Sequence, residues 1–276
     1  MSPFSAACAA VAGALMIASQ AVGAQSIADR VGQVKDGKVR MSFASRPEVC
    51  GNGEGNITIR SEGDDDNDHH VIVNGNNWMR SRDGDIEWEN VCEQGPVRVV
   101  MTVHDGRPTR LRSYVGGKWR VAGAEVADLG MVSVKAATDY LLALAAKDEG
   151  RAGKDAIFPA TLADSVELWP QLVKMARSDD IPTDTRKQAT FWLSQSAGAK
   201  VTESLASLAV SDTIDREVRE AAVFGLSQRR QSEGVPALIK IARSNRDPEL
   251  RKKALFWLGQ SGDPRAIALF EEILSK

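Results

Sequence analysis

The segment GDDDNDHH at 63–70 is the densest group of possible metal ligands in the chain. Asp64, Asp66 and Asp68 stand at every second position, as the first ligands of a calcium-binding loop do. Position six of such a loop would be His69 instead of Gly, and position twelve would be Gly75 instead of Glu. Because both diagnostic positions fail, we expect a solvated acidic turn between strands and predict no metal ligands. Binding of a metal or small ligand by this loop is the alternative.

The remaining reactive groups also lack a catalytic pattern. The chain has three histidines, and the adjacent pair His69 and His70 would point to opposite faces of a strand, away from a shared metal ion. The glycine-rich segments at 50–56 and 115–119 precede no expected helix, so we expect turns there and no phosphate loop. HExxH, GxSxG and GxxxxGKS/T motifs are absent. We predict no catalytic residue and no cofactor, with an unrecognised hydrolase site as the alternative.

The first 24 residues carry no charged side chain. The apolar run at 6–18 is too short to span a membrane as a helix. Val22 and Ala24 satisfy the small-residue rule for cleavage after Ala24, although the usual positive start is missing. We predict a signal peptide at 1–24 that exports the chain to the periplasm or beyond and leaves no membrane span. A buried apolar helix is the alternative.

Cleavage would remove Cys8 and leave two cysteines, Cys50 and Cys92. An even number of cysteines in an exported chain indicates a disulfide. Two thiols without a CxxC spacing are too few for a zinc site. We predict a Cys50–Cys92 disulfide, which would stabilise the fold by about 4 kcal/mol on the chain-entropy model.

The 276 residues are enough for two modest domains. Charged residues make up 26% and the net charge is −2, so nucleic acid and anionic membranes are not expected partners. We predict an α+β chain of two domains. A small antiparallel β domain linked by the disulfide occupies 25–128, and a helix followed by an all-α solenoid occupies 129–276.

The first domain has the two-residue period of short strands. At 97–115, apolar and polar residues alternate on both sides of Asp105 and Gly106, which indicates a hairpin. Further strands are predicted at 39–44, 56–61 and 69–74.

The second domain begins with an expected helix at 134–147 and shows no convincing strand. It contains nearly the same eleven residues twice, RKQATFWLSQS at 186–196 and RKKALFWLGQS at 251–261. A less similar copy lies at 219–229, and a degenerate one surrounds Phe158. A second set of similar segments recurs between these copies. Each period of about 33 residues therefore encodes two short helices, A in the first set and B in the second.

The B helices have apolar columns of their own. Residues four positions apart lie on one helical face. Neither helix of a period can bury its apolar surface alone, whereas stacked pairs share a continuous core. The columns are Leu172, Leu205, Leu238 and Leu269, and then Ala176, Ala209, Ala242 and Ile273.

The segment DPELRKKALFWLGQ, which begins at Asp247, resembles the HEAT repeat, in particular the short HEAT repeats of bilin-lyase-like proteins. DREVREAAVFGLSQ, from Asp215, resembles it more weakly. The likeness covers about 150–276, and the whole chain resembles exported bacterial HEAT-repeat-domain proteins, which share no assigned role. It implies an α-solenoid of about four helix pairs. It also implies that Arg219 and Arg251 each pair with the Asp four residues before them, whereas Arg186 has no Asp there.

Three further expectations concern the helices. Trp192 and Trp257 flank Gly225 in one column, so we expect core packing in which neighbouring helices interlock, with ligand stacking by the Trp residues as the alternative. Asp-Pro pairs predict the starts of two helices, at Asp247 and Asp263. Pro159 is expected to shorten the first A helix and make it the joint to the β domain.

A basic strip recurs on two B helices: Lys174 and Arg177, then Lys240 and Arg243. B helices usually line the concave side of HEAT solenoids, so the resemblance implies that this strip faces a partner. Solvated residues that complement the helix dipole are the alternative.

These observations favour a non-catalytic protein–protein interaction scaffold of the bacterial cell envelope, whose partner is an unidentified envelope protein. The alternatives are a metal- or small-ligand-binding module that uses 63–70, and a hydrolase. A chromophore lyase would fit poorly with an exported, disulfide-bearing chain.

Overall fold

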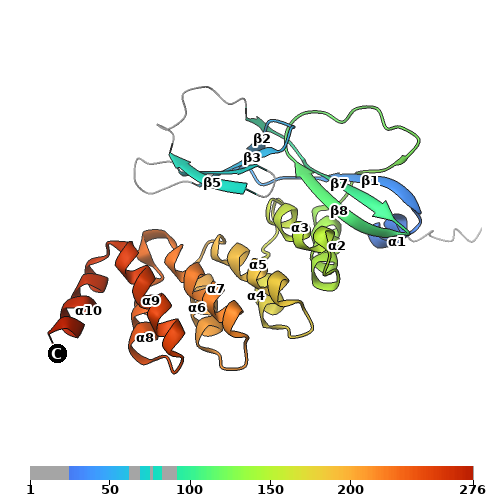
Figure 1. The fold of residues 1–276 in the computed structure, drawn as a ribbon. Coiled ribbons are helices and arrows are strands. Elements are labelled where there is room, and N and C mark those ends of the chain that lie inside the picture. Colours follow the sequence, from blue (N-terminus) through green and yellow to red (C-terminus); the bar gives the residue numbers. More distant parts are fainter. Residues whose placement is uncertain (1–24, 62–68, 75–76, 83–91, 276) are drawn as a thin grey trace, which may run out of the picture.

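The computed structural model describes residues 25–61, 69–74, 77–82 and 92–275. Two β-sheets lie over one end of a row of helices (Figure 1). The predicted combination of an N-terminal β region and a helical repeat region is therefore confirmed. The predicted signal peptide and most of the acidic segment lie outside the described residues.

The first sheet has four strands in the order β8-β7-β1-β9. They are β1 Asp36–Phe43, β7 Val97–His104, β8 Arg107–Tyr114 and β9 Val126–Met131. β7 and β8 form the predicted hairpin, and Asp105 and Gly106 at its tip both have positive φ, as a tight two-residue turn requires. Val39, Met41 and Phe43 of β1 are fully buried on the inner face.

The strand β9 corrects the prediction in two ways. It pairs in parallel with β1, so the sheet is mixed and not purely antiparallel. It also extends to Met131, past the point after which no strand was expected. Only Leu129 of its six residues is buried, so the segment has none of the alternation by which an amphipathic strand is recognised.

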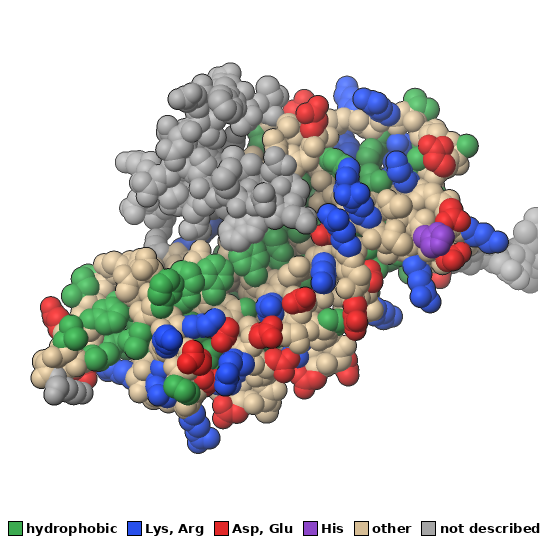
Figure 2. Space-filling view, in the orientation of Figure 1, with side chains coloured by type: hydrophobic (Ala, Val, Ile, Leu, Met, Phe, Trp, Pro, Cys, Tyr) green, Lys and Arg blue, Asp and Glu red, His purple; other side chains and the backbone are tan. Residues whose placement is uncertain are grey.

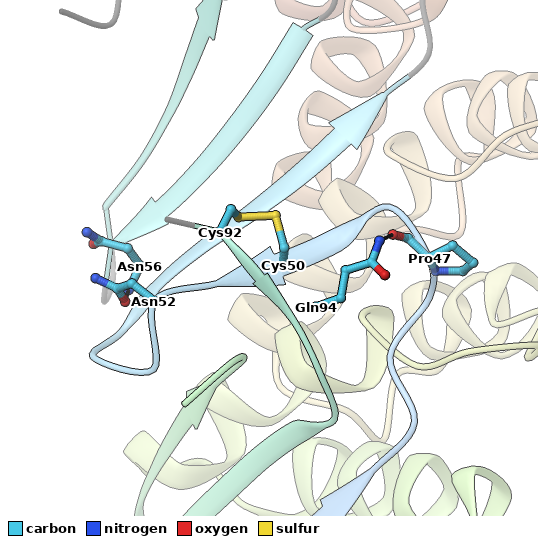
Figure 3. Close-up of a disulfide and its surroundings, with 6 residues drawn as sticks. All are labelled: Pro47, Cys50, Asn52, Asn56, Cys92 and Gln94. Carbon is cyan, nitrogen blue, oxygen red and sulfur yellow. Dashed lines mark hydrogen bonds between the residues drawn. A yellow bond between two sulfur atoms is a disulfide. The ribbon is translucent and has the colours of Figure 1, made fainter. Parts of the chain in front are cut away.

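The second sheet has the order β5-β4-β3-β2-β6. Its strands are β2 Val49–Gly51, β3 Asn56–Ser61, β4 His69–Asn74, β5 Asn77–Arg82 and β6 Glu93–Gln94. Cys50 of β2 and Cys92, just before β6, form a disulfide with their Cα atoms 5.2 Å apart (Figure 3). Beside it, Gln94 donates a hydrogen bond of 3.1 Å to the carbonyl oxygen of Pro47.

The remaining elements are helical. A short helix, α1 Ile27–Gly32, precedes the first strand, and α2 Val134–Lys147 coincides with the predicted helix. The A helices are α3 Arg151–Thr161, α5 Thr183–Ser194, α7 Arg216–Ser227 and α9 Pro248–Ser261. The B helices are α4 Trp169–Arg177, α6 Ala199–Val210, α8 Val235–Ser244 and α10 Pro264–Leu274. A helices pack on A helices and B helices on B helices along the row.

The predicted interior of this row is present. All four leucines of the first B-helix column are at most 2% exposed. Ala176 and Ala209 of the second column are fully buried, whereas Ile273 on the last helix is 49% exposed. Stacked pairs thus share one core, and its burial decreases at the last helix.

The first A helix contacts the β region, as predicted. Its expected shortening by Pro159 is slight: this residue lies inside α3, which has 11 residues where α5 and α7 have 12. The backbone N–H of Arg46 donates to the carbonyl of Leu162, and that of Asp164 donates to the carbonyl of Ala44. α3 also packs against β7 and β8, and the buried side chains of both regions form one continuous core. Among the described residues, no helix has the length and apolar character needed to cross a bilayer.

Candidate interaction surface

Ion pairs tie each A helix to the next repeat. Arg186 of α5 is 2% exposed and donates from Nη1 to Oδ2 of Asp215 over 2.9 Å. Arg219 of α7 is 8% exposed and lies 3.8 Å from Oδ2 of Asp247. Both aspartates stand at the start of the following A helix, so each buried guanidinium links two successive A helices.

This arrangement corrects the predicted pairing within each helix. Asp215 accepts from Arg186 of the preceding repeat instead of from Arg219, and Asp247 lies near Arg219 instead of Arg251. Arg251 donates to the carbonyl of Asn245 over 2.7 Å. The aspartate four residues before Arg219 or Arg251 thus pairs with the arginine of the preceding repeat. Arg186 and Arg219 also lie 3.1 and 3.7 Å from Asp179 and Asp212, in the loops just before their own helices.

A third buried arginine was not expected from the sequence. Arg229, directly after α7, is 8% exposed and donates to the carbonyls of Ser194 and Gly198 and to the hydroxyl of Thr202. It also forms a 2.9 Å ion pair with Glu233, which lowers the pKa of that carboxyl. Arg229 therefore holds the α5–α6 turn against the α7–α8 turn. The matching residues of the other repeats are Ser196 and Ser261, so the periodicity of the sequence could not identify Arg229.

The two Asp-Pro pairs act as predicted. The carboxylates of Asp247 and Asp263 accept from the backbone N–H groups of Glu249 and Arg265 over 3.0 and 2.8 Å. Hydrogen bonds from the Arg265 side chain keep the pKa of Asp263 well below its usual range. Both helix starts are thus set by local sequence.

The four residues of the basic strip are all exposed, but they are not equivalent. Arg177 donates to Ser207 of α6 over 2.9 Å, and Arg243 pairs with Glu272 of α10. These two arginines tie neighbouring B helices together. The ammonium groups of Lys174 and Lys240 have no hydrogen-bond or ion-pair partner among the described residues.

The strip is not continuous across α6. Ser207 and Val210 stand at the positions that match Lys174 and Arg177. Val210 is 48% exposed. The surface therefore presents a lysine on α4, an apolar residue on α6 and a lysine on α8.

Aromatic side chains form two clusters on the A helices. The ring of Trp192 lies 5.1 Å from Phe158 and 5.0 Å from Phe191. Trp257 repeats this with Phe224 and Phe256 at 5.1 and 5.0 Å. Hydrophobic side chains gather along the upper edge of the helical row in the view of Figure 2. Both Trp residues are partly buried and pack against the core, as expected.

The glycine between the two tryptophans in the repeat has different neighbours from those predicted. A Cβ at Gly225 would lie 3.1 Å from Ser194 and 3.1 Å from Leu205. Instead, the ring of each tryptophan packs against the phenylalanine ring of the preceding A helix. Gly225 thus allows α7 to approach α5 and α6 closely, but it does not interlock with either Trp.

The described residues contain no cluster of three or more metal-ligating side chains. The side chains of the predicted acidic loop lie outside the described part of the chain. Of the predicted site residues, the four strip residues and the two disulfide cysteines lie within the described part of the chain.

The helical repeats match a known family. Residues 214–276, which include α7 to α10, match the family model described as HEAT repeats. No curated protein matches the chain.

Proposed function

We propose that this HEAT-repeat domain protein is a non-catalytic scaffold of the bacterial cell envelope that holds an acidic polypeptide segment along its B helices. HEAT repeats generally mediate protein–protein interaction. The observation that carries the proposal is the pair Lys174 and Lys240. Both are exposed at matching positions two repeats apart, and neither ammonium group has a partner among the described residues.

The surface behind these lysines is rigid. Buried arginines tie successive A helices, and Arg177 and Arg243 tie successive B helices. A pre-ordered surface loses little conformational entropy when a partner docks. Rigidity therefore supports binding of an extended segment along the row.

The spacing defines the segment. Neighbouring helices pack at about 10 Å, so the two lysines stand about 20 Å apart. An extended chain covers that distance in about six residues. On α6, between these two helices, exposed Val210 stands three residues after the lysine position and offers a small apolar contact. The partner segment would have acidic residues about six positions apart with an apolar residue between them.

Binding of a fluorescein-labelled deca-glutamate peptide tests this surface at low salt by fluorescence anisotropy. We expect Lys174→Glu/Lys240→Glu to weaken binding about tenfold, since each exposed ion pair contributes up to about 1 kcal/mol. The control, Lys147→Glu/Lys252→Glu, makes the same charge change on α2 and α9 and should bind like the wild type. Equal affinity of the two double variants would contradict the proposed surface.

The native partner can then be sought with the same pair of variants. Cross-linking mass spectrometry on envelope fractions should give cross-links from α4, α6 and α8 to an acidic segment of another protein. Those cross-links should disappear in Lys174→Glu/Lys240→Glu and persist in the control. Cross-links confined to the β sheets would oppose a solenoid-bound partner.

Location in the envelope is supported by the disulfide and by the uncharged N-terminal segment at 1–24. The mass of the protein purified from the periplasmic fraction measures this directly. We expect a mature chain that begins at Gln25. A full-length chain recovered only from the cytosol would exclude it.

A further inference from the structure

The outer face of the four-stranded sheet carries a pocket of about 290 Å³. Residues directly opposite each other on neighbouring strands form its floor: Arg40 with Val100, Arg98 with Tyr114, and Lys38 with Val126. Because side chains alternate along a strand, these residues face away from the core that covers the inner face. The pocket is thus built on regular strands.

The glycine-rich segments singled out in the sequence form its wall. The backbone N–H of Gly53 donates to the carbonyl of Val115 over 2.9 Å. A Cβ at Gly53 would lie 2.9 Å from the Cα of Gly117, and one at Gly116 would meet the carbonyl oxygen of Gly51 at closer than contact distance. Only glycine permits this approach. The two loops, distant in sequence, therefore meet at the edge of the pocket, and Gly53 and Gly116 line it.

Trp119 lies against the pocket in a fixed orientation. Its Nε1 donates to the hydroxyl of Ser42 over 3.0 Å, and the guanidinium groups of Arg40 and Arg98 lie 5.0 and 5.9 Å from its ring centre. Arg40 also donates to the carbonyl of Arg120 over 2.8 Å. The loop that carries the indole is thus anchored to the sheet before any ligand arrives.

The positive charge of the pocket is compensated only in part. Four cationic side chains line it: Lys38, Arg40, Arg98 and Lys118. No carboxylate is among its lining residues. Asp128 lies near it, but this carboxylate is bound by Nε and Nη2 of Arg40 at 2.9 and 2.7 Å. Lys38 and Lys118 are exposed, and their ammonium groups have no partner within the described part of the chain.

Arg98 is the most informative of the four. Its Nη1 donates to the carbonyls of Gly116 and Pro96, whereas its Nε is buried without an acceptor. A buried donor without a partner is costly, so a ligand oxygen at this guanidinium would be favourable. Burial lowers the pKa of Arg98, and the negative charge of nearby Glu93 opposes this shift.

We propose that this pocket binds a small organic molecule that carries an oxyanion group, a carboxylate or a phosphate. Arg98, Lys38 and Lys118 would hold the charged group, since guanidinium and ammonium groups form the strongest hydrogen bonds with such oxygens. The body of the ligand would rest on Trp119 and the two valines. The volume limits the ligand to a small molecule. This site is independent of the solenoid surface.

Isothermal titration calorimetry with three probes tests the charge requirement: benzoate, phenyl phosphate and neutral benzamide. We expect saturable binding of at least one anion at low salt and at least tenfold weaker binding of benzamide. Equal binding of benzoate and benzamide, or no saturable binding of either anion up to millimolar concentrations, would overturn the proposal.

Variants locate the binding site. Lys118→Ala leaves the anchored loop intact, and we expect it to raise the Kd of the bound anion about fivefold. Lys35→Ala removes an exposed charge outside the pocket and should leave the Kd unchanged. Arg98→Met should abolish binding, but it also removes the bond to Gly116. Anion binding that Lys38→Ala/Lys118→Ala leaves unaffected would place the ligand elsewhere and refute the assignment.

Discussion

At the residue scale, the repeat depends on a few positions where side-chain volume is decisive. Gly225 is buried against Ser194 and Leu205, which leave no space for a larger side chain. Gly259 lies at a comparable place near the end of α9, but a Cβ there would meet only Phe270, at 3.9 Å. A side chain at Gly225 would therefore meet closely packed atoms, whereas one at Gly259 would have open space around it.

We therefore predict that Gly225→Leu destabilises the protein by about 1–3 kcal/mol through overpacking. Gly259→Leu should be neutral or stabilising, because leucine has the higher helix propensity and there is open space around it. Thermal unfolding monitored by circular dichroism compares the two. An unchanged melting temperature for Gly225→Leu would show that α7 does not need the close approach.

At the element scale, neighbouring A helices are held together by charge as well as by apolar packing. Asp215 begins α7 and receives hydrogen bonds from Arg186 and Thr183 of α5. Its side chain does not cap its own helix, so its contribution lies between the repeats. Glu217, two residues later, pairs with Lys187 only at the exposed surface.

Asp215→Ala should cost about 2 kcal/mol, because it removes the acceptor of Arg186 Nη1 and leaves this buried guanidinium to the exposed carboxylate of Asp179, 3.1 Å from Nη2. Glu217→Ala on the same helix should cost less than about 1 kcal/mol, as for other exposed pairs. Urea unfolding of both variants provides the measurement. Similar losses in the two would mean that the inter-repeat pair is no stronger than an ordinary surface pair.

At the scale of the whole molecule, the sheets and the helical row share one continuous core. Leu162 at the end of α3 is fully buried, and its carbonyl accepts a hydrogen bond from the β region. Leu274 on the last helix is 86% exposed. The joint is therefore expected to transmit stability between the two regions.

Leu162→Ala should destabilise the protein by about 2–5 kcal/mol, as other buried leucine truncations do. Hydrogen exchange should show an equal loss of protection in peptides from β7 and from α5, since both depend on the same core. Leu274→Ala should change neither. If only one of the two regions lost protection after Leu162→Ala, the sheets and the solenoid would be separate folding units.

The sequence by itself determined the helical row, because the 33-residue period and the leucine column recur in each repeat, and local Asp-Pro pairs mark the starts of the last two helices. It also identified the hairpin, whose alternation and turn residues lie within one short segment.

Only the tertiary structure decided the relations between distant segments. The partners of Arg186 and Arg219 lie in the next repeat, and Arg229 belongs to no column. β9 is a strand only because β1 lies beside it, and the two glycine-rich loops become a pocket wall only where they touch. In each case the energy comes from contacts between residues far apart in the chain, and no periodicity of a single segment records them.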